Sequence, residues 1–300
     1  MNSKKINKTL NTILALLIIL IIGIYGQQKL EESYSVPNIK EEVNNNSKLE
    51  IYFFDVGQAD SILIKEKENT VLIDAGNNED GKNLVNYIRE DLNISNIDIL
   101  VGTHPHEDHI GGIDDIIDSF DIGKIYLPNV TTTTKTFESV LDSIENKKYR
   151  ITIPKVDETI KLENMNFRVI YTGEDESDLN NSSIVLKLTY FNTSYLFTGD
   201  IEEEVEKIIL NKDIASDVLK VGHHGSKYST SDKFLNLVNP KHAIIEVGKN
   251  NSYKHPHEET LTKLKNKDIE VYRTDELGTI KLISDGTNIN IDYIKTNLDG

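Results

Sequence analysis

The chain has 300 residues, 38% of them hydrophobic, which is enough to bury the core of one large domain or two small ones. Its 49 acidic and 33 basic side chains give a formal net charge of −16, and this excess of negative charge argues against nonspecific binding to nucleic acid. Because cysteine is absent, disulfides, thiol nucleophiles and thiolate metal sites are excluded, so any transition metal must be held by histidines and carboxylates.

The first 26 residues differ in composition from the rest of the chain. Lys4, Lys5 and Lys8 precede an apolar stretch at residues 13–25, an arrangement typical of a secretory signal peptide or a signal anchor. The stretch is short for a bilayer helix, which needs roughly 20 apolar residues, and it lacks a clear cleavage site, so both alternatives stay open. Residues 1–26 are predicted to form a hydrophobic helix that places the remainder at the extracellular face of the membrane or secretes it.

Residues 27–48 are rich in Glu, Asn and Ser and are predicted to be a polar linker, since this composition buries too little apolar surface to fold. Regular apolar patterns begin after the linker. They predict strands at residues 49–54, 61–64 and 70–73, an amphipathic helix at 84–92 and a buried strand at 97–101. The last of these strands runs directly into a histidine-rich turn.

That turn, at residues 103–109, reads Thr-His-Pro-His-Glu-Asp-His. His104 and His106 are two residues apart at the end of a strand, so their side chains can point the same way and share one ion. Asp108 and His109 lie where the next helix begins and therefore point at the same spot. Neutral imidazoles with a carboxylate suit zinc, with manganese and iron as alternatives. The sequence thus predicts a metal site at this turn.

The second half of the chain repeats this logic. Strands are predicted at residues 184–189, 195–198, 217–221 and 243–247, with an acidic helix at 201–210. The second of these strands leads to Asp200, whose carboxylate can bridge two ions, and the third leads to His223 and His224. Successive residues of an extended backbone point to opposite sides, so at most one of these two imidazoles is expected to face the metals directly.

A loop at residues 250–257 reads Asn-Asn-Ser-Tyr-Lys-His-Pro-His and is well placed to line the mouth of a cleft. His255 either lines that cleft or caps the helix that follows, and His257 is expected at the surface. Two more strands, at 278–282 and 288–293, give both halves a mixed order of strands and helices. This order favours an α/β sandwich with two sheets inside and helices outside.

Several of these segments resemble a known family. They are residues 54–60 (Phe-Asp-Val-Gly-Gln-Ala-Asp), 72–76 (Leu-Ile-Asp-Ala-Gly), the His-x-His-x-Asp-His turn, 197–200 (Phe-Thr-Gly-Asp) and 222–226 (Gly-His-His-Gly-Ser). Together they resemble the metallo-β-lactamase-fold superfamily, and within it the hydrolase domain of ComEC-type competence proteins. The resemblance implies that residues 49–295 form one hydrolase domain, a four-layer αββα sandwich.

The resemblance also implies a centre of two Zn²⁺ ions, with Mn²⁺ or Fe as alternatives. Related proteins usually supply a third histidine to the first ion, whereas residues 180–183 here read Asn-Asn-Ser-Ser. Asn181 could reach that ion or bind substrate instead. The implied ligands are His104 and His106 for the first ion, Asp108, His109 and His224 for the second, and Asp200 between the two.

Other residues are expected to act on the substrate or to support the centre. His223 either donates a proton, or orients a ligand and packs. Asp74 follows an apolar strand and is expected to tie down the loop beneath the metals by hydrogen bonds. The expected catalytic residues are Asp108, His223 and His255, and the expected substrate-binding residues are Asn181, Ser226 and Lys227.

Residues 218–257 carry six lysines and two acids, a local formal charge of +4 that favours an anionic substrate at the rim of the site, although such lysines can also merely keep helices soluble. The leading hypothesis is an exported or membrane-anchored hydrolase that cleaves phosphodiesters, in DNA or in a phosphorylated cell-surface polymer, by a metal-bound hydroxide. The alternatives are a small-molecule hydrolase acting on lactams, lactones or thioesters, and a non-catalytic, metal-stabilised surface module. No protein partner is predicted.

Overall fold

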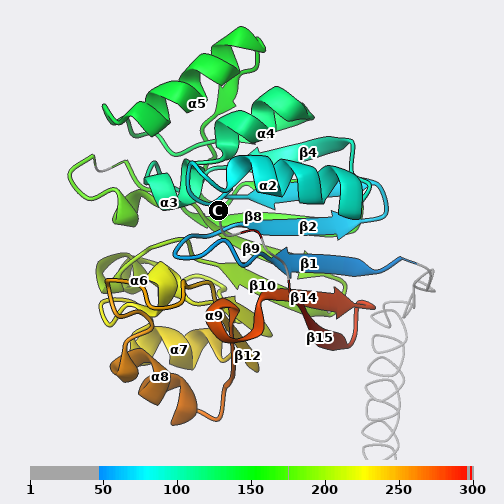
Figure 1. Cartoon of the computed structure of the whole chain (residues 1–300). Coiled ribbons are helices and arrows are strands. Elements are labelled where there is room, and N and C mark those ends of the chain that lie inside the picture. Colours follow the sequence, from blue (N-terminus) through cyan, green and yellow to red (C-terminus); the bar gives the residue numbers. More distant parts are fainter. Residues whose placement is uncertain (1–46, 175, 296–297, 299–300) are drawn as a thin grey trace, which may run out of the picture. The chain divides into compact units, whose positions relative to one another are not determined.

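Two β-sheets face one another in the computed structural model of the chain, with helices on their outer sides (Figure 1). The structure describes residues 47–174, 176–295 and 298. The predicted signal segment at residues 1–26, with its hydrophobic helix, and residues 27–46 of the predicted linker lie outside the described residues. Among the helices of the described residues, none is long and apolar enough to cross a bilayer.

The first sheet begins with an antiparallel meander formed by the three strands predicted first, β1 (Leu49–Phe53), β2 (Ile62–Glu66) and β3 (Asn69–Ile73). Its strands, in the order in which they lie side by side within the described residues, are β15 (Ile289–Ile294), β14 (Thr279–Ser284), β1, β2, β3, β4 (Asn96–Val101), β5 (Asp121–Tyr126) and β6 (Ile151–Thr152). The pairings from β15 through β14, β1 and β2 to β3 are antiparallel, and those from β3 to β6 are parallel.

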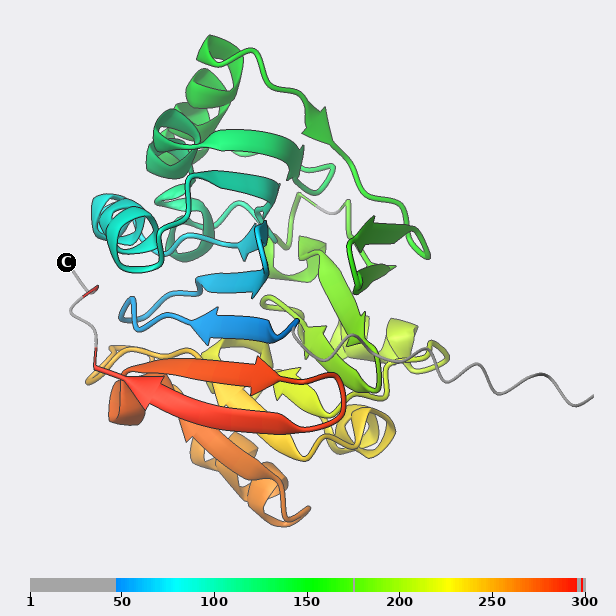
Figure 2. The same ribbon diagram turned by 90° about the vertical axis from the view of Figure 1, so that its right-hand side faces the viewer.

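The second sheet has the same mixture of directions. Its strands, in spatial order, are β13 (Glu270–Arg273), β12 (His242–Ile245), β11 (Val218–Lys220), β10 (Thr193–Phe197), β9 (Val185–Tyr190), β8 (Met165–Tyr171) and β7 (Thr159–Leu162). Strands β7 to β10 pair antiparallel, and β10 to β13 pair parallel. Figure 2 shows the strands of this sheet, in green to orange, beside the blue and red strands of the first sheet.

Helices cover the outer face of each sheet (Figure 1). Those on the first sheet are α2 (Gly81–Asn86), α4 (Ile113–Ser119) and α5 (Lys135–Asn146), and those on the second are α6 (Glu203–Ile209), α7 (Asp232–Val238) and α8 (Glu258–Lys265). Shorter elements are the π-helical turn Tyr87–Asp91, α3 (Glu107–Ile110), the 3-10 turns Asn180–Ser182 and Gly222–Gly225, and α9 (Thr274–Leu277).

The strands are apolar on both faces because each sheet is buried on both sides. In β1, Ile51 and Phe53 point into the core between the sheets, while Tyr52 packs with the helices outside. Across the central core, the ring centroids of Phe53 and Phe197 are 6.3 Å apart. Successive strand residues point to opposite faces, so a near-continuous apolar run is what such a doubly covered sheet requires. The layers therefore form the predicted αββα sandwich.

The carboxyl ends of the parallel strands position the polar residues. Asp74 follows β3, the histidine-rich turn follows β4, Asp200 comes shortly after β10, and His224 comes shortly after β11. In sheets of this type, ligands bind at the carboxyl ends of parallel strands, because the loops there leave a crevice between elements. Both sheets thus deliver their polar residues to one place.

Two predicted helices have different bounds in the structure. The helix expected at residues 84–92 begins at Gly81, and its final turn, Tyr87–Asp91, is π-helical. Its early start follows a tight loop in which the Asp80 carboxylate accepts a 2.7 Å hydrogen bond from the backbone N–H of Asn77. The acidic helix expected at 201–210 is confined to Glu203–Ile209.

Candidate metal centre

The histidine-rich turn joins β4 to α3. The backbone of His106 is extended (φ −80°, ψ 150°) immediately before α3, so the chain turns sharply and brings His109 back toward His104. The ring centroids of His104 and His109 are 4.1 Å apart, and Nε2 of His104 lies 3.0 Å from Nδ1 of His106. His104 and His109 are fully buried. A single turn therefore gathers three imidazoles.

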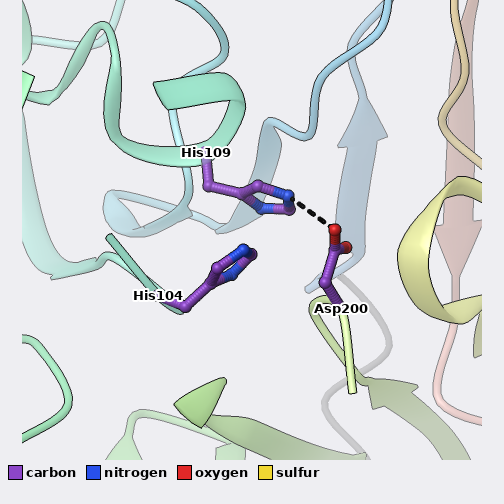
Figure 3. Close-up of side chains that lie close together, drawn as sticks. All are labelled: His104, His109 and Asp200. Carbon is purple, nitrogen blue, oxygen red and sulfur yellow. Dashed lines mark ion pairs between the residues drawn. The ribbon is translucent and has the colours of Figure 1, made fainter. Parts of the chain in front are cut away.

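Asp200 and His224 approach this turn from the second sheet. Oδ2 of Asp200 lies 3.3 Å from Nε2 of His109, and the two side chains point toward one another beside His104 (Figure 3). Nε2 of His224 lies 3.4 Å from Oδ2 of Asp108 and 3.7 Å from Oδ2 of Asp200. Residues far apart in the sequence therefore meet in one cluster of donor atoms.

All six predicted ligands meet in this cluster, and the three predicted for the second ion, Asp108, His109 and His224, form one group of donor atoms. His109 belongs to three such groups, whereas the resemblance assigns it to the second ion alone. His106 joins the first group through its 3.0 Å contact with His104. Within each group the donor atoms lie within 4.8 Å of one another. The two groups made of predicted ligands are His104 with His109 and Asp200, and Asp108 with His109 and His224; the third is Asp60 with Asp74 and His109.

Asp74 orients His109 from beneath the centre. Its Oδ2 lies 2.8 Å from Nδ1 of His109, and its two oxygens accept 2.7 Å hydrogen bonds from the backbone N–H and the hydroxyl of Thr103. A proton held on Nδ1 leaves the lone pair of Nε2 of His109 free to bind a metal ion. This nitrogen faces Asp200, which is the arrangement a metal ligand needs. The prediction that Asp74 ties down this loop by hydrogen bonds is confirmed.

The turn after β11 does not have the extended backbone that the sequence predicted for His223 and His224. His223 and His224 are not extended, because their φ angles of 50° and 51° lie in the left-handed region. Nδ1 of His224 lies 2.9 Å from the carbonyl oxygen of Glu246, so it carries the proton and Nε2 faces the centre. Nε2 of His223 lies 3.8 Å from Oδ2 of Asp200. Both imidazoles therefore line the cavity, although only His224 belongs to a donor group.

Behind His224 lies a buried charged network that the sequence analysis missed. Nζ of Lys220 is 2.7 Å from Oδ2 of Asp60 and 4.0 Å from Oε2 of Glu246, and Oδ1 of Asp60 is 3.2 Å from Nδ1 of His224. None of the three charged side chains belongs to a residue more than 1% exposed. A signal was present, because Lys220 lies between Leu219 and Val221 and Glu246 lies between Ile245 and Val247, and charges in such apolar surroundings need buried partners.

Carboxylates dominate the charge around the donor groups. Burial lowers the pKa of His224, but the carboxylates of Asp200 and Asp60 outweigh it and raise that pKa to about 10. Burial also opposes the ionisation of Asp200, yet His109 and His224 hold the pKa of its carboxyl well below the usual range. The cluster therefore attracts positive charge, first as protons on His109 and His224.

Several donor atoms have no other partner. Nε2 of His109, Nε2 of His224 and Oδ1 of Asp200 are buried and make no hydrogen bond within the described residues. Buried polar atoms are normally satisfied, so orphaned atoms that converge from separate elements call for a missing partner. Imidazole nitrogens and carboxylate oxygens in this arrangement are the donor set of a divalent transition metal ion. The residues present therefore fit such an ion.

A cavity of about 470 Å³ opens beside the donor groups. The described residues that line it include no aliphatic side chain. His255 lines its mouth with Tyr253, whereas the residue that precedes α8 as its cap is His257. Burial lowers the pKa of His255 to about 4, so its imidazole is neutral near pH 7. The lining residues are Gln58, Asn77, His106, Glu107, Asp108, Asn180, Asp200, His223, His224, Tyr253 and His255.

The three predicted substrate-binding residues do not line this cavity. Nδ2 of Asn181 donates to Asp178 at 2.6 Å, and its Oδ1 accepts the backbone N–H of Glu202 at 2.9 Å, so both ends of the amide hold the fold together. Ser226 is buried in the turn after β11, and its backbone N–H donates to the carbonyl of His223. Lys227 is exposed beside Tyr228.

Asn180, and not Asn181 as predicted, faces the cavity. It lines the cavity, it interacts with the imidazole of His106, and its Oδ1 is buried without a hydrogen-bond partner in the described part of the chain. The two asparagines differ because they follow one another in a tight 3-10 turn, Asn180–Ser182, whose successive side chains leave in different directions.

The predicted basic rim is only partly present. Lys220 is buried against Asp60, and Lys241 pairs with Asp217 at 3.2 Å. Among the described residues that line the cavity there is no lysine or arginine. Lys249 and Lys254 are exposed on the loop that carries Tyr253.

The chain is similar in sequence to proteins of a known family. Residues 54–248 match the protein family described as "Metallo-beta-lactamase superfamily". The chain is 32% identical over 256 residues to ComE operon protein 3 of Bacillus subtilis (strain 168), covering 79% of this chain and 33% of that protein. It is 26% identical over 232 residues to Competence protein ComA of Neisseria gonorrhoeae, covering 76% and 31%. The chain thus spans about a third of the length of these curated relatives, and the predicted resemblance is confirmed.

Among solved structures, the metallo-beta-lactamase fold protein YhfI from Bacillus subtilis matches with a TM-score of 0.54 and 10% sequence identity. The match covers 79% of this chain and 100% of that chain. At this level of identity the likeness establishes a shared fold.

Proposed function

We propose that this chain, which belongs to the metallo-beta-lactamase superfamily and is a metal-dependent hydrolase of that fold, hydrolyses phosphodiesters. The observation that carries the proposal is the pair of donor groups that share His109 and open onto a cavity with a polar lining. A small apolar substrate such as a lactam is usually held by apolar side chains, and the described lining offers none of aliphatic type. A phosphodiester suits amide, imidazole and phenol groups better.

Two Zn²⁺ ions, or Mn²⁺ or Fe in their place, are the proposed cofactors. Divalent ions bound side by side lower the pKa of a coordinated water and offset the charge that develops on phosphate oxygens. Asp74 and the carbonyl of Glu246 fix the tautomers of two imidazoles, so that Nε2 points inward in both. The proposed ligands are His104, His106, Asp108, His109, Asp200 and His224.

The chain's own residues supply the proton transfers in this proposal. Burial opposes the ionisation of Asp108, but His224 and His109 hold the pKa of its carboxyl below the ordinary value, so an ionised carboxylate faces the cavity. We assign to it the proton of the attacking water. His223 lines the cavity, with its Nε2 3.8 Å from Oδ2 of Asp200 and its Nδ1 3.3 Å from the Glu202 carboxylate, and we assign to it the proton given to the leaving oxygen.

DNA or a phosphorylated cell-surface polymer is the proposed substrate, and the location follows from the N-terminal sequence. The relatives include Competence protein ComA and Recombination protein 2 of Haemophilus influenzae, which is 28% identical over 234 residues, 76% of this chain and 28% of that protein. These names support an encounter with DNA. Export, followed by secretion or anchoring at the extracellular face, rests on residues 1–26 alone.

A panel of substrates tests this proposal. The purified protein, loaded in turn with Zn²⁺ and Mn²⁺, is assayed on bis-p-nitrophenyl phosphate, single-stranded and duplex DNA, a glycerol phosphate polymer, a chromogenic lactam and a lactone. We expect hydrolysis of phosphodiesters, loss of activity with a chelator, and loss of activity in His109→Ala and Asp200→Ala with an unchanged circular dichroism spectrum. Turnover of the lactam or lactone alone would replace the proposal with a small-molecule hydrolase.

A matched control guards against a general effect of losing an imidazole. His242 pairs with Glu270 at 3.2 Å and does not line the cavity, so His242→Ala is expected to retain full activity. If metal binds with full occupancy and no substrate of the panel is turned over, the chain is a non-catalytic, metal-stabilised module.

A further inference from the structure

Three aromatic rings lead from the solvent to the donor groups. Tyr253 is 66% exposed at the mouth of the cavity, and its ring lies 5.7 Å from that of His255 at an interplanar angle of 23°. The ring of His255 lies in turn 6.3 Å from that of His224 at 26°. The rings are thus nearly parallel, and the outermost presents much of its surface to water.

The loop that carries these rings is held in place by its own side chains. Nδ2 of Asn251 donates to the carbonyls of Gly248 and His255 at 2.9 and 2.7 Å, and its Oδ1 accepts the backbone N–H of His255 at 2.9 Å. Gly248 packs so closely on the Gln58 segment that a Cβ there would lie 2.5 Å from the backbone nitrogen of Gln58. A loop fixed before binding loses little conformational entropy when a ligand arrives.

The chemistry of this surface favours a flat, uncharged ring as its ligand. Exposed aromatic side chains bind nucleobases by stacking, and they do so with little dependence on sequence because every base has a π-face. Lys249 and Lys254 are exposed on the same loop and can meet the phosphates on either side of a stacked base. A glycerol or ribitol phosphate polymer has no planar ring and would leave the face of Tyr253 unused.

We infer that Tyr253 and His255 form a stacking platform that holds a base of a nucleic-acid strand beside the scissile phosphodiester. The inference rests on the proposed function and narrows its substrate to a strand whose bases are unstacked, as in single-stranded DNA or RNA. In a duplex the bases face one another, so the platform is reached only at ends or gaps. Tyr253 is then a residue that sets specificity, and the donor groups perform the reaction.

Binding and kinetics test the platform separately. A labelled single-stranded phosphorothioate oligonucleotide, which resists hydrolysis, is compared by fluorescence anisotropy with an oligonucleotide of the same backbone that lacks bases, using the metal-loaded full chain. Tyr253→Ala is expected to weaken binding of the base-containing strand by about 5- to 100-fold, the range for one lost stack, and Tyr253→Phe by less than about twofold. Binding of the abasic strand should change in neither variant.

Tyr228 provides the matched control. It is 60% exposed and lies outside the cavity lining, so Tyr228→Ala is expected to bind both strands as the unchanged protein does. A 2-aminopurine base in the strand should lose fluorescence on binding to the unchanged protein and to Tyr253→Phe, but not to Tyr253→Ala. With a hydrolysable strand, Tyr253→Ala should raise KM far more than it lowers kcat.

The outcomes separate the platform from the proposed function. Equal effects of Tyr253→Ala on base-containing and abasic strands would overturn the platform, and so would a glycerol phosphate polymer that competes as well as the oligonucleotide. Base-dependent binding through Tyr253 in a protein that cleaves no phosphodiester would keep the platform and refute the proposed hydrolysis. Phosphodiester cleavage that depends neither on the bases nor on Tyr253 would support the proposed hydrolysis and refute the platform.

Discussion

Lys220 and Asp60 form a buried ion pair, with 2.7 Å between Nζ and Oδ2, directly behind the imidazole of His224. Both residues are only 1% exposed, and the second oxygen of Asp60 faces Nδ1 of His224 at 3.2 Å. Oδ2 of Asp60 also lies 3.9 Å from Nδ1 of His109. One fixed positive charge thus balances a carboxylate that two proposed metal ligands share.

Replacing Lys220 tests how much this ion pair contributes to stability and to metal binding. In Lys220→Met the Asp60 carboxylate is left buried without its cation, so we expect the metal-free protein to lose about 3–5 kcal/mol of unfolding free energy. We also expect about 10- to 100-fold weaker metal binding, because the partner of His224 is displaced. Urea unfolding with a chelator present and competition with a metal-binding dye measure the two effects.

The double variant Lys220→Met with Asp60→Asn is the control for this prediction. It leaves no unpaired charge, so it should recover part of the stability that the single variant loses. A double variant no more stable than Lys220→Met would show that the ion pair does not account for the loss.

Asp74 should act through His109 rather than through the fold. Asp74→Asn removes the negative charge beside Nδ1 of His109 but keeps an oxygen that can accept a hydrogen bond, and we expect about 10- to 100-fold weaker metal binding. Asp98 is the matched control, since its carboxylate accepts the backbone N–H of Thr70 at 2.8 Å away from the centre. Unchanged metal affinity in Asp74→Asn, or an equal loss in Asp98→Asn, would contradict the role given to Asp74.

Metal binding near pH 7 should release protons. Burial lowers the pKa of both His109 and His224, but Asp200 with Asp74 or Asp60 outweighs it, raising the pKa of His109 well above the usual value and that of His224 to about 10. The metal-free protein therefore holds these protons at pH 7, and an ion must displace them. Metal affinity should accordingly rise with pH until the pH approaches about 10.

Stability of the metal-free protein should change in the opposite direction. A raised pKa in the folded state means that the charged imidazole stabilises the fold fully below the unfolded pKa, about 6.5, and that this contribution is lost as pH rises through about 10.

Calorimetry of Zn²⁺ binding in two buffers with different ionisation enthalpies counts the protons that the metal ion releases. A binding heat that is independent of the buffer would refute the expected release.

The early ligands and ten of the fifteen strands in the described part of the chain are predicted because their signals are local, whereas β5 to β8 and β13 are not predicted. His104 and His106 end a strand and Asp108 and His109 begin a helix, so one turn contains the information that brings them together. Asp200 is predicted in the same way, from an apolar strand that ends in a carboxylate. The αββα order follows from apolar runs that must be covered on both faces.

What the sequence does not predict depends on contacts between the sheets or on backbone angles. The pair of Asp60 and Lys220 joins residues far apart in the chain, and only the packing of the two sheets makes them neighbours. The left-handed backbone at His223 and His224 is set by the turn as a whole, so the alternation rule for extended strands fails there.

Asn180 and Asn181 offer a test in which neighbours of the same type should behave differently. Asn180 faces the cavity with an unpartnered Oδ1, so Asn180→Ala should lower kcat/KM by about 10-fold or more and weaken metal binding while the melting temperature stays unchanged. Asn181→Ala should lower the melting temperature and leave kcat/KM and metal binding unchanged. It strips Glu202 of a buried hydrogen-bond acceptor and Asp178 of a donor, which should cost about 1–3 kcal/mol of unfolding free energy. Thermal melts and steady-state kinetics on both variants decide the assignment. A change in kcat/KM confined to Asn181→Ala would show that Asn181, as predicted from the sequence, binds the substrate.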